Sequence, residues 1–348
     1  MTRREVLRSL PALAIAPRLF AQATKPTIAV KALNQFTLRV SDVKRSVDFY
    51  QGLFGMPIQT RQGSTVLLRI GNGPQFIAIS QAGSNPPSIA PLIGMSVENF
   101  NAERLAGILA QHGIAKAEPA DTGLSGGPLK MRIWKRGPED GGAKDGTTEL
   151  FFGDPEGLTV QLTDTKYCGG AGVLGDVCPN PEPSSKKGLI AVKDLNHFTI
   201  NESDGSRSNA FYQELFGLHV RSRQGAASGL GVGPGAMFVM FAGGAGGRGT
   251  TNAAPRPASI NHVCMNMENF NPDNVLRILA SYGITARENP QGPVGPLRSY
   301  VSLRMENRGG APEGTPELYF TDPDGLLIQL QDVSYCGGAG FLGNVCAG

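Results

Sequence analysis

Residues 316–346, PELYFTDPDGLLIQLQDVSYCGGAGFLGNVC, have a second copy at residues 148–178, TELFFGDPEGLTVQLTDTKYCGGAGVLGDVC. Both cysteines, the Asp-Pro-acid-Gly turn and a Gln on the following run recur 168 positions apart. Alternating apolar runs flank a turn in which Pro restricts φ and Gly takes the strained position, so each copy is predicted to be a β-hairpin. A short Cys-bounded loop follows each hairpin. The chain therefore contains one supersecondary unit twice.

The repeat extends upstream of the hairpin. LNQFT at residues 33–37 matches LNHFT at 195–199, and FYQGLFG at 49–55 matches FYQELFG at 211–217. These matches are offset by 162 positions, and a longer glycine-rich stretch at residues 243–257 accounts for the later change of offset. The duplication therefore covers nearly all of the chain after its N-terminal segment.

Composition and patterning indicate two globular domains. The 348 residues are 40% hydrophobic and 18% charged, and 47 glycines favour short strands joined by turns. Helical spacing predicts helices over residues 42–54 and 271–282, each in a strand, helix, strands order that occurs four times. Residues 179–188, which include PNPEPSSKK, have the composition of a linker. We therefore expect domains at 28–178 and 189–348.

Residues 1–23 have the pattern of a targeting segment. Paired arginines precede a short apolar run, and AQA at residues 21–23 suits a signal peptidase. The arginine pair resembles a twin-arginine export signal, with an ordinary secretory signal as the alternative. The segment predicts a periplasmic or secreted protein, and its apolar run is too short to span a membrane. It also carries the whole formal charge of +3, so there is no electrostatic case for nucleic acid or an anionic membrane as partner.

Five cysteines would experience an oxidising compartment after export. The simplest connectivity pairs Cys168 with Cys178 and Cys336 with Cys346, each closing a glycine-rich loop. Cross-pairing between the copies remains open at this stage, and a zinc site is less favoured because the spacing is too wide for a zinc knuckle. Cys264 is left over and is interpreted as a buried apolar residue.

Three motifs carry a family resemblance: the FYxxLFG helix end, the DPxG turn followed by an apolar strand with Gln, and the Asn-His-Phe first strand. With four βαβββ units, they resemble the vicinal oxygen chelate superfamily. That superfamily includes glyoxalase I, fosfomycin-resistance proteins, methylmalonyl-CoA epimerases and type I extradiol dioxygenases. The resemblance implies an α+β fold in which paired units form two half-open barrels, with a divalent metal in the cup of a barrel.

The duplication helps to separate architecture from chemistry, because positions alike in both copies favour a structural role and positions that differ are candidates for chemistry. Three of the four histidines lie in the second copy at positions that differ between copies. The four changes that stand out are Gln35 to His197, Leu92 to His262, Phe151 to Tyr319 and Pro57 to His219.

The resemblance implies that His197, His262 and Gln329 bind the metal of the second domain. Two imidazoles and one oxygen donor suit Fe(II) or Mn(II), and Zn(II) less specifically. The family position of Gln329 normally holds Glu, and Gln161 repeats it in the first copy, which favours a structural hydrogen-bonding role as the alternative. Tyr319, ten positions before Gln329, would orient the substrate or else serve as a core aromatic. His219 is a candidate acid–base group or a residue of the barrel rim.

We therefore expect an enzyme that oxidises a catechol or a similar small molecule with vicinal oxygens, as extradiol dioxygenases do. The alternatives are a lyase or isomerase similar to glyoxalases and epimerases, and a metal-free module that binds a small molecule, as bleomycin-resistance members do. A homo-oligomer is compatible with each. Superfamily membership alone does not choose among these functions.

Overall fold

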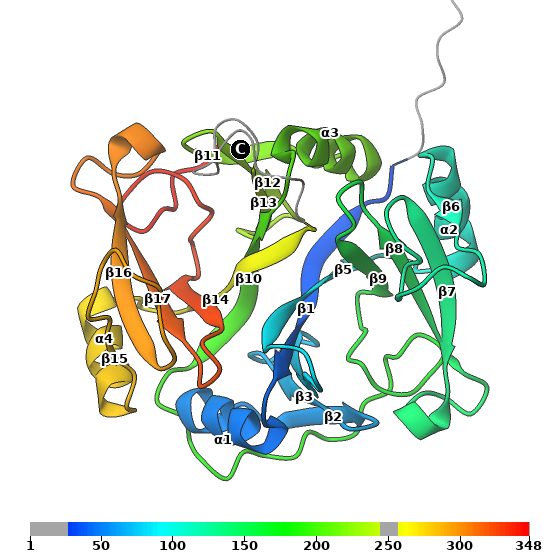
Figure 1. The fold of residues 1–348 in the computed structure, drawn as a ribbon, viewed down its shortest axis with the longest axis horizontal. Coiled ribbons are helices and arrows are strands. Elements are labelled where there is room, and N and C mark those ends of the chain that lie inside the picture. Colours follow the sequence, from blue (N-terminus) through cyan, green and yellow to red (C-terminus); the bar gives the residue numbers. More distant parts are fainter. Residues whose placement is uncertain (1–26, 244–256, 348) are drawn as a thin grey trace, which may run out of the picture.

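The protein is described by a computed structural model over residues 27–243 and 257–347. Two nine-stranded sheets and four α-helices make up this part of the chain, one sheet and two helices for each copy of the repeat (Figure 1). The predicted α+β fold and its four βαβββ units are confirmed, and the second and fourth units each carry one additional two-residue strand. The predicted targeting segment, residues 1–23, lies outside the described residues.

The first sheet has the order β2-β3-β4-β1-β5-β9-β8-β7-β6, and the second has the equivalent order β11-β12-β13-β10-β14-β18-β17-β16-β15. The first comprises β1 (Val30–Val40), β2 (Ile58–Gln62), β3 (Thr65–Arg69), β4 (Phe76–Gln81), β5 (Ser88–Val97), β6 (Ala115–Lys116), β7 (Lys130–Arg136), β8 (Thr147–Gly153) and β9 (Thr159–Asp164). The second comprises β10 (Val192–Asn201), β11 (Val220–Gln224), β12 (Ala227–Gly231), β13 (Phe238–Ala242), β14 (Ser259–Met267), β15 (Thr285–Ala286), β16 (Arg298–Arg304), β17 (Thr315–Thr321) and β18 (Leu327–Asp332).

Capping residues define the helices. The α-helices are α1 (Val43–Phe54), α2 (Ala102–Gln111), α3 (Gly205–Phe216) and α4 (Pro272–Ser281). At the start of α1, the Asp42 carboxylate accepts the backbone N–H of Arg45, and the helix ends at Gly55 with φ of 68°. Gly55 suits this left-handed position because it has no Cβ. Pro272 occupies the first turn of α4, where its missing N–H removes no helical hydrogen bond.

The repeated turn is held by its own aspartate. In the second copy, the Asp322 carboxylate accepts the backbone N–H groups of Asp324 and Leu326, each at 2.9 Å. Asp154 makes the same two bonds in the first copy. This arrangement joins β17 to β18 and sets the register that places Tyr319 opposite Gln329.

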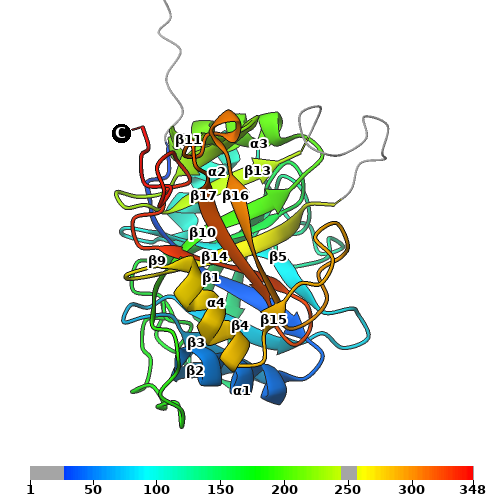
Figure 2. The same ribbon diagram turned by 90° about the vertical axis from the view of Figure 1, so that its left-hand side faces the viewer.

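Each helix packs on its own sheet, and α1 and α3 in addition contact the sheet of the other half. Phe49 and Phe54 of α1 contact Phe320 of β17, with ring centroids 6.5 and 6.1 Å apart. The equivalent rings of α3, Phe211 and Phe216, contact Phe152 of β8. Figure 1 shows α1 beside the strands of the second half, and Figure 2 shows the same helix below α4 and β15. One continuous hydrophobic core therefore joins the two halves.

Both local disulfides form, Cys168–Cys178 and Cys336–Cys346, which confirms the simplest connectivity. Cys264 is a free thiol and is buried, as predicted. No helix in the described part of the chain is long and apolar enough to cross a membrane.

Candidate metal centre

Three adjacent strands of the second sheet bring the predicted ligands together. His197 of β10 lies opposite Cys264 of β14, which in turn lies opposite Gln329 of β18. His262 precedes Cys264 by two residues and so projects from the same face of the sheet. The two imidazole rings are 5.5 Å apart between centroids and meet edge to face at 83°. The structure thus places His197, His262 and Gln329 in one cluster.

All three side chains are buried, with 2%, 7% and 1% of their surfaces exposed for His197, His262 and Gln329. Phe238 stacks on the His197 ring at 4.2 Å, and Tyr335 lies 5.6 Å from the same ring. Water therefore has little access to the imidazoles.

An asparagine orients each imidazole. His197 Nδ1 is 2.7 Å from Asn196 Oδ1, and His262 Nδ1 is 2.8 Å from Asn261 Oδ1. An amide oxygen can only accept, so we assign the proton of each ring to Nδ1. Each Nε2 then keeps its lone pair, as a metal ligand requires. The sequence contains both Asn-His pairs, and the prediction used Asn196 only as part of the Asn-His-Phe motif and did not use Asn261.

Burial keeps both imidazoles neutral. It lowers the pKa of His262 to about 4, and the nearby Gln329 amide partly opposes this effect. The pKa of His197 is lowered well below its ordinary value, first by burial and then by repulsion from His262. Neutral imidazole is the form that binds metals, so the pair is ready to act as ligands near neutral pH.

Gln329 has a fully buried side chain that lies close enough to both imidazoles to raise their pKa values, yet neither its Oε1 nor its Nε2 makes a hydrogen bond of normal geometry. Leaving such groups unpaired costs about 1–3 kcal/mol each. Native structures usually avoid this cost by pairing such groups with the protein, with an ordered water or with a bound ion. A divalent cation bound by the two imidazoles and Gln329 Oε1 would satisfy the orphaned oxygen, so these residues fit a metal.

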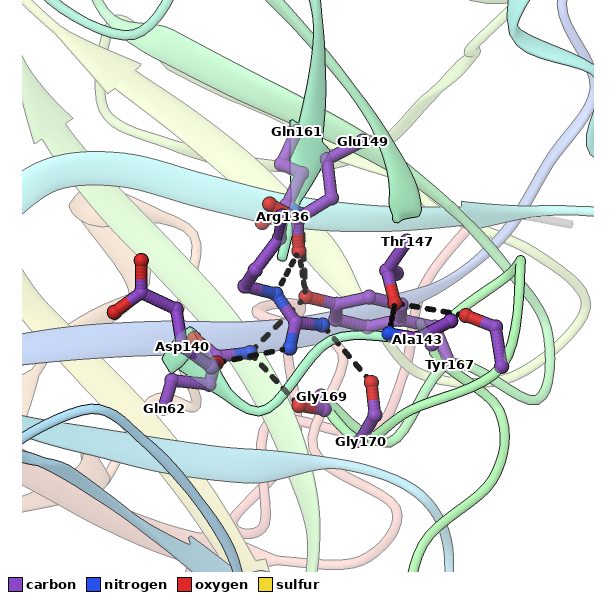
Figure 3. A network of polar contacts seen from close by, with 12 residues as sticks. Gln62, Arg136, Asp140, Ala143, Thr147, Glu149, Gln161, Tyr167, Gly169 and Gly170 are labelled. Carbon is purple, nitrogen blue, oxygen red and sulfur yellow. Dashed lines mark hydrogen bonds and ion pairs between the residues drawn. The ribbon is translucent and has the colours of Figure 1, made fainter. Parts of the chain in front are cut away.

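The first copy closes the same position with its own side chains. Gln35, at the place of His197, donates to Gln161 Oε1 at 2.5 Å, and Gln161 Nε2 donates to the Tyr167 hydroxyl at 3.4 Å. Figure 3 shows Gln161 next to the network of Tyr167, Glu149 and Arg136. The alternative that both glutamines serve as structural hydrogen-bonding residues therefore holds for Gln161 and does not hold for Gln329.

Tyr319 borders the cluster. Its ring is 5.2 Å from the His262 ring, edge to face, and stacks on Tyr300 at 5.1 Å. Burial raises the pKa of Tyr319 well above its ordinary value, so its hydroxyl stays protonated. This hydroxyl donates to Glu317 Oε2 at 3.4 Å.

Glu317 is committed to a structural ion pair. Arg304 Nε donates to Glu317 Oε1 at 2.7 Å, and the Tyr335 hydroxyl donates to the same oxygen at 2.9 Å. The first copy repeats this arrangement, in which Arg136 and Tyr167 hold Glu149. No three His, Cys, Asp or Glu side chains group as a metal site among residues 27–243 and 257–347. The candidate donor set is therefore two imidazoles and one amide oxygen.

His219 lies outside the cluster. It is exposed and precedes β11, the edge strand, and β12 and β13 separate β11 from β10. Its backbone carbonyl accepts the N–H of Gly231. Cys264, buried as predicted, shares the sheet face of His197 and Gln329 and stands where the first copy has Gly94.

Solved structures resemble this fold over most of its length. A catechol 2,3-dioxygenase matches with a TM-score of 0.56 and 16% identity, covering 90% of this chain and 93% of that one. The Mn(II)-bound glyoxalase from Novosphingobium aromaticivorans matches at 0.55 and 15%, covering 87% and 82%. Homoprotocatechuate 2,3-dioxygenase from Brevibacterium fuscum, in complex with 3,4-dihydroxyphenylacetate, matches at 0.56 and 16%, covering 88% and 82%. At these identities the similarity establishes the fold.

The family follows from the sequence. Residues 32–162 and 194–330 each match the model of the Glyoxalase/Bleomycin resistance protein/Dioxygenase superfamily. The chain belongs to this superfamily, with two copies of its domain. No curated protein sequence matches the chain.

Proposed function

We propose that this protein is a metal-dependent enzyme whose second half, residues 189–348, acts on a small molecule with vicinal oxygens, most directly by extradiol-dioxygenase-like oxidation of a catechol. The observation that carries the proposal is the buried trio of His197, His262 and Gln329, with two neutral imidazoles and a glutamine that lacks any hydrogen-bond partner. Similarity to catechol dioxygenase structures supports the reaction class.

His197 and His262 would hold Fe(II) or Mn(II) through Nε2, and Gln329 through Oε1; Zn(II) suits the donors less specifically. The bound ion would supply Lewis acidity toward two adjacent substrate oxygens. Asn196 and Asn261 hold the imidazoles in the ligating tautomer. Phe238 shields the His197 ring from water. Tyr319 would position the substrate beside His262 through its protonated hydroxyl.

A glyoxalase-like or epimerase-like reaction is the second candidate, and one observation favours it. The histidine proposed as acid–base group, His219, is exposed at the far edge of the sheet. Within the described residues the two buried imidazoles of the cluster are both assigned as ligands. A reaction in which the metal only polarises a diol or carbonyl places less demand on a separate acid–base histidine.

We further propose that the first half, residues 28–178, binds no metal, because Gln35 stands in place of a histidine there and its amide N–H group already occupies Gln161 Oε1. Residues 1–23 would direct export to the periplasm or the medium. The two disulfides are compatible with an extracellular location.

The test is metal analysis of the purified protein after anaerobic loading with Fe(II), Mn(II) or Zn(II), followed by activity assays. One bound ion per chain with oxygen uptake on catechol or 3,4-dihydroxyphenylacetate supports the dioxygenase. One bound ion without oxygen uptake, but with turnover of a methylglyoxal–thiol adduct, supports the second candidate. A protein that takes up no ion contradicts both and leaves a metal-free binding module.

A further inference from the structure

A pocket of about 340 Å³ lies at the seam between the two halves and shares no residue with the candidate metal centre. Phe54 and Met56, at and just after the end of α1, form an apolar wall, and Val192 lies at the start of β10. Arg69, at the end of β3, and the exposed Asn72 in the following turn supply polar groups. The pocket thus combines an apolar lining with hydrogen-bond donors.

Arg69 is the unusual residue of this pocket. Its guanidinium makes no hydrogen bond or ion pair within the described residues, and its Nε is fully buried without a partner. The residue as a whole is half-buried, and its two terminal NH2 groups are not among the buried atoms. These terminal groups line the pocket without a partner in the described part of the chain and are therefore free to donate to an acceptor from outside the chain.

The surrounding groups do not supply that acceptor. The carbonyl of Pro57 accepts the backbone N–H of Arg69 itself, and the carbonyl of Met56 accepts from the side chain of Gln51. The other lining cation, Lys193, is already paired with Glu268 at 3.0 Å. No Asp or Glu lines the pocket. An anion from outside the chain would therefore meet no fixed negative charge there.

At the equivalent place in the second half, the arginine side chain finds its hydrogen-bond acceptors within the chain. Gly231 stands where the first half has Arg69, and the guanidinium of Arg221 lies against it, 2.7 Å from where a Cβ would be. Arg221 donates to the carbonyls of Gly233, Gly235 and Met237. An arginine without a hydrogen-bond partner is therefore specific to the pocket at Arg69, and the second copy of the repeat does not have one at the equivalent place.

We propose that this pocket binds a small anion, a carboxylate or a phosphate, attached to an apolar body. The planar guanidinium of Arg69 would donate two parallel hydrogen bonds to two oxygens of the anion, and the Asn72 amide would donate a third. The apolar body would lie against Phe54, Met56 and Val192. A volume of about 340 Å³ is at the lower end of the range for small-molecule sites.

The test is calorimetric titration of the full chain, at low ionic strength, with benzoate, phenyl phosphate and inorganic phosphate. We expect saturable binding of benzoate or phenyl phosphate, and weaker binding of inorganic phosphate because it lacks an apolar body. Arg69→Gln should weaken binding at least about tenfold, since it removes the charged fork. Arg39→Gln, an exposed arginine on β1, is the matched control and should leave binding unchanged.

A second variant keeps the test valid if Arg69→Gln fails to fold. Asn72→Asp adds a negative charge at an exposed turn and should weaken binding of both organic anions several-fold. His197→Ala should retain anion binding, which separates this site from the metal centre. Absence of saturable binding, or equal affinity in wild type, Arg69→Gln and Asn72→Asp, would overturn the proposal. The relative affinities of benzoate and phenyl phosphate distinguish carboxylate from phosphate ligands.

Discussion

Gln35 and His197 occupy the same strand position in two copies of one sheet, yet they relate differently to the glutamine two strands away. Gln35 donates to Gln161 at 2.5 Å, whereas His197 bonds to its neighbour Asn196 and leaves Gln329 without a partner. In the first copy both polar atoms of Gln161 therefore have protein partners, although Gln35 Oε1 has none. In the second copy, the same scaffold leaves the Gln329 amide without a hydrogen-bond partner beside the His197 imidazole, and both are candidate metal ligands.

Replacing His197 by Gln should recreate the closed arrangement of the first copy. We expect metal affinity to fall by more than about 100-fold, because a ligand is lost and Gln329 gains a protein partner. The folded state should persist, since the same pair exists at Gln35 and Gln161. Metal content after dialysis measures the effect. His219→Gln is the control, and equal metal loss in both variants would contradict the assignment.

Gln329→Glu should bind a divalent metal more tightly than the wild type. A carboxylate adds a negative charge to a donor set that is otherwise neutral, and this strengthens the attraction to the cation. Competition with a chelator measures the affinity. Gln161→Glu makes the same change in the first half and should not create a second metal ion per chain. Unchanged or weaker affinity in Gln329→Glu would argue against ligation at this position.

Tyr319→Phe should lower kcat by about 100-fold while leaving metal content and thermal stability close to those of the wild type. The first copy has Phe151 at this position, so the sheet accepts a ring without a hydroxyl. Steady-state kinetics of the metal-loaded enzyme gives the comparison. If kcat stays within twofold of the wild type, Tyr319 is a core aromatic.

Glu202→Gln should remove a pH dependence of stability. Burial, with repulsion from Asp154, raises the pKa of Glu202 from 4.5 to about 9. The carboxyl of Glu202 faces Asp154 and Glu156, and Arg207 pairs with Glu156. Between these two pH values the folded protein holds a proton that the unfolded chain has lost, so stability falls as pH rises through this window.

The variant should therefore be more stable than the wild type by about 1–3 kcal/mol at pH 8 and should show a flatter profile. Urea unfolding between pH 5 and pH 9 supplies the measurement. Glu313→Gln, at an exposed position, is the reference and should follow the wild-type profile. A wild-type free energy of unfolding that rises over this range would refute the prediction.

Arg304→Met should destabilise the second half by about 3–5 kcal/mol, because Glu317 would remain buried without its cation. The side chains of Arg304 and Glu317 are 0% and 6% exposed. Arg298→Met breaks an ion pair with the exposed Glu288 and should cost less than about 1 kcal/mol. Chemical denaturation distinguishes the two, and similar small losses would show that the buried pair contributes little.

The duplication predicted much of this molecule. Period-2 runs, the Asp-Pro turn and the helix caps are local signals, and the structure follows them at α1, α4 and both hairpins. Comparing the copies also selected His197 and His262 as candidate ligands, and the structure places their rings 5.5 Å apart. Local patterns do not report which sheet a helix covers, so the packing of α1 against Phe320 of the other half was not predicted.

By itself, the sequence determined the repeated α+β architecture, the local cysteine pairs and the two histidines that distinguish the second copy, because each depends on residues close together in the chain or on comparing one copy with the other. Only the tertiary structure decided that Gln329 lacks a partner while Gln161 has one, and that Arg69 faces a pocket with no acceptor. Whether a buried polar group is satisfied depends on neighbours that only long-range packing brings near.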